Sequence, residues 1–352
     1  MIRIGILTFY YKNYNYGGIL QAYALEHFLN SCFHDVKAEQ ICYDRTRVPL
    51  SLFDRTIRFL CRGDIKRKIA KQPAKRALSH SNYSAIDKFA SDTIIHTERV
   101  YDGISYRDMG AEYDVLICGS DQVWNPIAVR DAYFFKKINK KKISYAASIA
   151  AGDLKLPERI KYKKALSSFS AISVREESAR KQLVELIDKK IATVLDPVLL
   201  LTKDDWNAVA ADRIISKPYM FTYFLGNVGA NAKNGAERST EKKIVSIEGL
   251  AFGSENEEIL SGVGPDEFLS LIKYADEIWT DSFHALVFSV IFERPFRVFS
   301  REGEVADMSE RITDILKMLE LKPENQESYR NAKKILEEKR EESIVFLKNA
   351  IY

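Results

Sequence analysis

Short apolar runs alternate along the chain with longer segments whose apolar residues recur every third or fourth position. The run Val115–Cys118 is continuously apolar and Ile2–Phe9 is mostly apolar, which is typical of strands buried on both faces. The segment Ile19–Asn30 instead carries its apolar residues at helical spacing. Because such strands and helices follow one another repeatedly, the pattern predicts parallel sheets covered by helices.

The same pattern predicts most individual elements. The expected strands are Ile2–Phe9, Val36–Tyr43, Val115–Cys118, Ile143–Ala147, Ala171–Val174, Ala192–Leu195, Tyr219–Leu225, Lys243–Ile247, Glu277–Thr280 and Phe296–Phe299. The main expected helices are Ile19–Asn30, Pro157–Phe169, Gly264–Tyr274, His284–Phe292 and Gln326–Asn349. We therefore expect an α/β protein with two Rossmann-like, doubly wound domains that face a cleft. Residues 1–205 would form the first domain, with a basic helical insertion at about 50–90, residues 206–325 the second, and residues 326–352 a C-terminal helix.

Polar clusters follow several of the expected strands. Since open parallel sheets bind ligands at the carboxyl ends of their strands, these clusters are the candidate ligand-binding loops. They are Tyr14–Gln21, Gly119–Asn125, Ser173–Ser178 and Thr280–His284.

The charge of the chain is nearly balanced, with a formal net charge of +4 over 352 residues. No overall field therefore favours nucleic acid as a partner. One segment, Arg55–Arg76, is strongly basic and has nine Lys or Arg against the single acid Asp64. It is either a solvated basic face or a contact for anionic lipid headgroups or a pyrophosphate-linked substrate.

The four cysteines show no metal-ligand spacing and no disulfide framework, which favours a reducing compartment. No apolar run is long enough to cross a bilayer, and the apolar N-terminal run is too short for a signal peptide. We expect a cytoplasmic protein, peripheral at the inner face of the membrane if the basic segment binds lipid. No resident metal or cofactor is expected.

The cluster Thr280–His284 lies where a strand gives way to a buried helix. Free amides at a helix start suit an anion, and Ser282 and His284 could add donors. The alternative is that Ser282 or Asp281 merely caps the helix and His284 packs as a polar residue. Arg175 follows another strand and offers a planar fork for phosphate or carboxylate. The plainer alternative for it is a surface ion pair.

Two further loops carry groups suited to sugars. Gly119–Asn125 combines Asp121, Gln122, Trp124 and Asn125, which supply planar polar groups and an aromatic face. The alternative is an Asp-rich turn with Trp124 in the core. The loop Tyr14–Gln21 offers Asn15, Gly17, Gly18 and Gln21 at a helix start. It matches no nucleotide-binding motif, and the glycines could supply only a tight turn.

Five separated stretches occur in an order that resembles one family. They are Gly17–Leu25 (GGILQAYAL), Asp114–Asn125 (DVLICGSDQVWN), Ser173–Ser178 (SVREES), Val194–Leu200 (VLDPVLL) and Thr280–His284 (TDSFH). From Ile4 to about Leu319 the chain resembles the polysaccharide pyruvyl transferase family. The resemblance implies two domains arranged as in GT-B glycosyltransferases. It also implies phosphoenolpyruvate as donor and co-substrate, and a sugar acceptor in a growing surface glycan such as an exopolysaccharide or capsule, often lipid-linked.

The resemblance also implies roles for particular residues. Arg175 and His284 match the arginine and histidine with which family members bind the donor, and Ser282, Arg294 and Arg301 are further donor-side candidates. We expect His284 to be the general acid. Asp121 would be the acceptor-side base or would orient a hydroxyl. The sequence departs from the family at Ala285, where Gly is common, and at Arg294, where Lys is common.

Two other functions fit the same fold. A GT-B glycosyltransferase would use a nucleotide sugar and ignore phosphoenolpyruvate. A non-catalytic glycan-carrier-binding protein would use the basic segment Arg55–Arg76. The fold alone does not separate them from a pyruvyl transferase.

Overall fold

The computed structural model describes residues 1–47, 77–150, 152–229, 232, 235, 243–300, 307–321 and 326–352. The basic segment Arg55–Arg76 and the donor-side candidate Arg301 lie outside these residues, so the expectations placed on them remain predictions. In the part of the chain that is described, no helix is both long and apolar enough to span a bilayer.

The first half of the chain forms a six-stranded parallel sheet in the order β2-β1-β3-β4-β5-β6. Its strands are β1 (Ile2–Leu7), β2 (Val36–Gln40), β3 (Val115–Cys118), β4 (Lys141–Ala147), β5 (Ala171–Val174) and β6 (Ile191–Thr193). Its helices are α1 (Tyr16–Cys32), α3 (His80–Thr93), α4 (Met109–Glu112), α5 (Leu156–Leu166) and α6 (Glu177–Val184), with short 3₁₀ turns η1 (Ser105–Asp108), η2 (Asp131–Phe134) and η3 (Pro197–Leu199).

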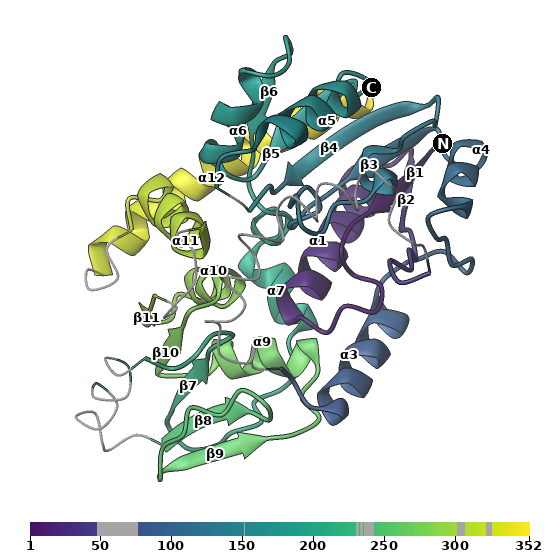
Figure 1. Ribbon diagram of the computed structural model, residues 1–352. Coiled ribbons are helices and arrows are strands. Elements are labelled where there is room, and N and C mark those ends of the chain that lie inside the picture. Colours follow the sequence, from purple (N-terminus) through teal and green to yellow (C-terminus); the bar gives the residue numbers. More distant parts are fainter. Residues whose placement is uncertain are drawn as a thin grey trace.

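The second half forms a five-stranded parallel sheet in the order β11-β10-β7-β8-β9. Its strands are β7 (Tyr219–Tyr223), β8 (Lys243–Ile247), β9 (Glu257–Leu260), β10 (Glu277–Thr280) and β11 (Phe296–Val298). The helices of this half are α7 (Lys203–Val209), α9 (Pro265–Lys273), α10 (Phe283–Ile291), α11 (Asp307–Met318) and α12 (Gln326–Ile351). The two parallel sheets confirm the predicted fold class (Figure 1).

Helix α1 begins earlier than its apolar pattern predicted, and its cap explains why. The side chain of Asn15 accepts a hydrogen bond from the backbone N–H of Gly18, at 3.1 Å, and so satisfies one of the free amides of the first turn. The helix is buried nearly all round because it packs against the first sheet and against elements of the second half. This position brings its first turn into the region between the two sheets.

Strand β9 was missed by the sequence analysis. Its sequence, EEIL, has no continuous apolar run, because it is a half-exposed edge strand that pairs on one side with β8. Glu257, at its start, accepts hydrogen bonds from the backbone N–H groups of Phe252 and Gly253. These bonds and the pairing with β8 hold the strand, and neither leaves a periodic signal in the sequence.

The C-terminal helix α12 returns to the first sheet after the chain has passed through the second half (Figure 1). The hydroxyl of Ser343 on α12 accepts a hydrogen bond from the backbone N–H of Leu195, at 3.0 Å, and Lys141 on β4 donates to the carbonyl of Ile351. On another side, the Asn82 side chain of α3 bonds the backbone of Glu248 and Val263. These buried polar contacts fix the two halves with the carboxyl ends of their strands facing each other.

Candidate active site

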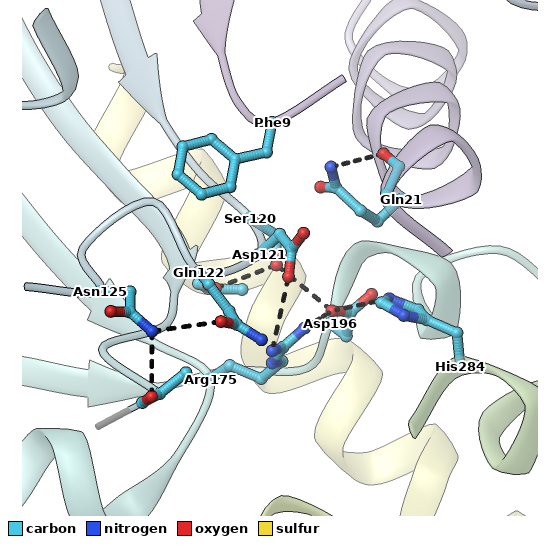
Figure 2. Close-up of polar contacts among 12 residues, drawn as sticks. Phe9, Gln21, Ser120, Asp121, Gln122, Asn125, Arg175, Asp196 and His284 are labelled. Carbon is cyan, nitrogen blue, oxygen red and sulfur yellow. Dashed lines mark hydrogen bonds and ion pairs between the residues drawn. The ribbon is translucent and has the colours of Figure 1, made fainter. Parts of the chain in front are cut away.

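The side chains of an arginine, an aspartate and a histidine meet where the two halves of the protein face each other (Figure 2). Arg175 directly follows β5, Asp196 lies just beyond β6, and His284 belongs to the first turn of α10. The topology therefore brings the carboxyl ends of two strands of the first sheet next to a helix start of the second half. This is the position at which open parallel sheets bind ligands.

Asp196 is the centre of this cluster, and its carboxylate is fully buried. One carboxylate oxygen, Oδ2, accepts a hydrogen bond from Arg175 Nη1 at 2.6 Å and lies 3.7 Å from His284 Nε2. The same oxygen is 3.3 Å from the hydroxyl of Ser120, which donates to it. The other oxygen, Oδ1, accepts from the backbone N–H of Val198 and thereby begins the turn η3.

The electrostatics follow from this geometry. Burial alone would raise the pKa of Asp196, but the contact with His284 and the ion pair with Arg175 outweigh it and hold the pKa well below its usual range. Burial alone would lower the pKa of Arg175, but the carboxylates of Glu176, Asp196 and Asp121 raise it. Asp196 and Arg175 are therefore both charged at neutral pH.

Arg175 is held on several sides. Its Nε donates to Glu176 Oε1 at 3.2 Å, and its guanidinium lies over the ring of Phe283, 4.6 Å from the ring centroid. Its remaining terminal nitrogen, Nη2, is buried, 4.0 Å from Asp121, and has no hydrogen-bond partner among the described residues. Because an unpaired buried guanidinium N–H is costly, this nitrogen is suited to an incoming anion.

The sequence left open whether His284 packs as a polar residue or takes part in a site. Its Nε2 is buried and, within the described chain, has no hydrogen-bond partner, since the 3.7 Å contact with Asp196 is too long for one. Ser282 is the N-cap of α10, and its side chain makes no capping bond. The first amides of a helix lack partners within the helix, and His284 belongs to the same first turn of α10, which is an arrangement that favours an anion.

Gly17 touches His284 directly across the two halves of the protein. A Cβ atom on Gly17 would lie 2.1 Å from His284 Nδ1, so no larger residue fits there without moving the imidazole. The neighbouring Gly18 differs, because a Cβ there would mainly meet the side-chain amide of Asn13. The sequence offered Gly17 and Gly18 as acceptor-side residues or as a tight turn; in the structure both belong to helix α1, and Gly17 packs against His284.

The remaining acceptor-side candidates lie near the cluster, with different surroundings. Asp121 is partly exposed and faces Arg175, and the side-chain amide of Gln122 lies 3.1 and 3.2 Å from the guanidinium nitrogens of Arg311 on α11. Gln21 is buried and donates to Thr8 Oγ1 and to the carbonyl of Gly18. Asn15 is occupied as the cap of α1.

Three predicted site residues do not fit the roles expected of them. Trp124 is fully buried, stacks near Phe134 and donates to the carbonyl of Tyr133, so it offers no ring face to a sugar. Asn125 is engaged with the carbonyl of Ala150 and the N–H of Ile127, which stabilises its own loop. Arg294 lies beyond the C-terminal end of α10, whereas His284 lies in its first turn, and the helix from His284 to Ile291 alone spans about 10 Å at 1.5 Å per residue.

Asp196 is the residue that the sequence analysis missed. In the sequence, the pair Asp196–Pro197 directly follows the expected strand Ala192–Leu195 and indicates only that the strand ends there. In the structure Asp196 is the N-cap of η3. Its contacts with Arg175 and His284 join residues far apart in the sequence, so no local spacing could predict them. The one available signal was its place within the stretch Val194–Leu200, which belongs to the family resemblance.

The fold and the position of the cluster define the class of protein as an α/β protein of GT-B type. Comparison with solved structures supports this class. A putative UDP-N-acetylglucosamine 2-epimerase from Listeria monocytogenes is similar to the chain with a TM-score of 0.52 and 10% identity, over 94% of this chain and 90% of that one. A UDP-N-acetylglucosamine 2-epimerase from Rickettsia bellii has a TM-score of 0.50 and 11% identity, over 100% and 97%. At such low identity these similarities establish the fold alone.

The family is defined by the sequence. The profile of the polysaccharide pyruvyl transferase family matches residues 15–303, which include Arg175, Asp196 and His284. The chain belongs to the polysaccharide pyruvyl transferase family, a family of transferases. A search of the curated proteins finds no match.

The contact between Gly17 and His284 leads to a first prediction. Gly17→Ala should lower the free energy of unfolding by about 1–3 kcal/mol, as overpacking does, because the imidazole must move. Gly18→Ala is the matched control and should cost less, since the Asn13 side chain can yield. Urea unfolding measures both, and the double variant Gly17→Ala, His284→Ala should recover much of the loss. Equal costs for the two single variants would contradict the contact.

The buried carboxylate leads to a second prediction. Asp196→Asn should lower the free energy of unfolding at pH 7 by about 3–5 kcal/mol, because Arg175 then loses a buried partner charge. A lowered folded-state pKa stabilises the protein above the ordinary aspartate pKa of about 3.9, and this contribution fades as the pH falls below it. The difference between the two proteins should therefore shrink on acidification. A difference that stays constant from pH 7 to pH 2, or one no larger than that of the exposed Asp188→Asn, would rule out the ion pair.

Proposed function

We propose that this protein transfers a pyruvyl group from phosphoenolpyruvate to two hydroxyls of one sugar and forms a cyclic ketal with release of phosphate. The sugar belongs to the precursor of a bacterial surface polysaccharide. The observation that carries the proposal is the meeting of Arg175 and His284 on Asp196, beside the free amides of α10. These groups are the ones in this chain that match the donor-binding residues of the family.

The donor is recognised by its charges. Phosphoenolpyruvate carries a carboxylate and a phosphate, and the site supplies Arg175 Nη2, the imidazole of His284 and the start of α10. Ser282, at the N-cap, adds a hydroxyl donor. In this proposal Asp196 does not contact the donor. It holds the side chains of Arg175 and His284 next to each other. Arg301 remains a further candidate outside the described residues.

The reaction then follows the chemistry of an enol phosphate ester. Protonated His284 gives its proton to the methylene carbon, which becomes a methyl group and leaves an oxocarbenium-like centre on the adjacent carbon. A sugar hydroxyl adds to that centre, and the bond to phosphate breaks. The second hydroxyl of the same sugar closes the ring. Of the two hydroxyl protons, one restores His284 and the other leaves with phosphate.

The remaining parts of the proposal concern the acceptor and the location. Asp121 faces Arg175 and orients an acceptor hydroxyl or accepts its proton. No further cofactor is needed, because the enol phosphate already carries the activated pyruvyl group. A lipid-linked sugar would place the cytoplasmic protein at the inner face of the membrane, where the basic segment Arg55–Arg76 could contact anionic lipid.

Donor binding can be measured without knowing the acceptor. Phosphoenolpyruvate should raise the thermal midpoint of unfolding, since a ligand at a hundredfold excess over its Kd stabilises the folded state by about 2.7 kcal/mol. Arg175→Lys should lose most of the shift because it keeps the charge but not the fork. Arg294→Lys, at the far end of α10, is the matched control and should keep it. A shift with UDP and none with phosphoenolpyruvate would contradict the proposal and favour glycosyl transfer.

The role of His284 is tested by turnover. With a panel of p-nitrophenyl hexosides as acceptors and saturating phosphoenolpyruvate, His284→Gln should release phosphate about 10²–10⁴ times more slowly than the parent protein. Circular dichroism and the unfolding midpoint serve as folding controls. A correctly folded His284→Gln protein with near-parental turnover would show that another group supplies the proton.

A further inference from the structure

A cavity lies beside Arg175 and Asp196. It has a volume of about 450 Å³, within the range of small-molecule sites. The strand ends β5 and β6, the start of α10, and the helices α11 and α12 surround it. Its lining residues that matter here are Arg175, Glu176, Glu177, Asp196, Phe283 and Met318.

Glu176 lines this pocket, and one of its carboxylate oxygens has no hydrogen-bond partner among the described residues. The residue is buried, and its Oε1 accepts a hydrogen bond from Arg175 Nε. Its other oxygen, Oε2, is buried too and has no hydrogen-bond partner in the described part of the chain. A carboxylate oxygen removed from water without a donor is costly, so a ligand that brings a donor would be favoured there.

The neighbouring Glu177 has no such unpaired carboxylate oxygen. Glu177 also lines the pocket, but both of its oxygens are engaged. Arg180 donates to Oε1 and to Oε2, and Thr193 donates to Oε2 at 3.0 Å. Two adjacent carboxylates thus face one pocket, and only the buried one offers an unused acceptor.

The charges of the lining decide which kind of ligand fits. Four acids and four bases line the pocket: Glu176, Glu177, Asp196 and Asp314 against Arg175, Arg311, Lys317 and Lys339. Arg175 Nε and Nη1 are already taken by Glu176 and Asp196. A multiply charged anion therefore gains little here. A neutral ligand rich in hydroxyls gains a strong acceptor, and apolar walls such as Phe283 and Met318 suit the C–H face of a sugar ring.

We propose that this pocket binds a neutral pyranose ring of the acceptor, with Glu176 Oε2 accepting a hydrogen bond from one of its hydroxyls. The inference rests on the proposed function, because the shared wall at Arg175 sets this ring beside the donor. Glu176 is then a specificity residue for the acceptor and takes no part in proton transfer to the donor.

The test uses methyl β-D-glucoside, methyl β-D-galactoside and methyl β-D-mannoside as probes, with the full-length protein. Crystals soaked in each should show at least one ring in this pocket with a hydroxyl within hydrogen-bond distance of Glu176 Oε2. The Kd of that glycoside, measured by NMR titration, should rise about tenfold or more in Glu176→Gln and stay unchanged in Glu177→Gln. Rings bound elsewhere, no bound ring with any probe, or equal effects of the two variants would overturn the proposal.

Two controls keep the outcomes separate. If Glu176→Gln does not fold, Met318→Trp fills the pocket from α11 instead and should abolish glycoside binding; unchanged binding in that variant would overturn the proposal. The stabilisation by phosphoenolpyruvate is measured in every variant. If phosphoenolpyruvate does not stabilise the parent protein, the result counts against the proposed function. If phosphoenolpyruvate stabilises the protein but the glycoside Kd is the same in Glu176→Gln as in the parent, the result counts against this inference alone.

Discussion

One buried carboxylate organises the region between the two halves of the protein. Asp196 has no access to water, so its charge is tolerable only because Arg175, Ser120 and the backbone of Val198 satisfy it. Asp196 also holds Arg175, whose guanidinium lies over the ring of Phe283. His284, a residue of the other half, has its Nε2 3.7 Å from Asp196 Oδ2. The groups that we propose to bind the donor are thus positioned by a buried charge that, in the same proposal, does not contact the donor.

The rest of the fold maintains this arrangement. Gly17 leaves room for His284 at the start of α1, and α12 bonds to the backbone beside Asp196 through Ser343. Both contacts link segments far apart in the chain. Arg175 carries the unpartnered Nη2 and also lines the charge-balanced pocket. The proposed donor site and the proposed acceptor pocket would therefore share this residue.

The sequence predicted the strands that are buried on both faces, because a short continuous apolar run such as Val115–Cys118 is typical of a buried strand. It also located Arg175 and His284 at element ends. It could not predict β9, which is held by pairing with β8 and shows no apolar periodicity, or the hydrogen bond from the Ile127 N–H to the Asn125 side chain. The sequence left Trp124 open between a sugar-facing and a core indole, and the structure places it in the core. Arg294 was grouped with the donor-side candidates because residue type alone does not tell one end of a helix from the other. Asp196 was missed because its partners are distant in sequence.

The most direct test of the account is a crystal structure of the protein with phosphoenolpyruvate bound. We predict the donor at the start of α10, with one acidic group within hydrogen-bond distance of Arg175 Nη2 and another beside His284, while Asp196 keeps its contact with Arg175. Phosphoenolpyruvate bound away from both residues, or a donor held directly by groups that exclude Arg175, would contradict the account.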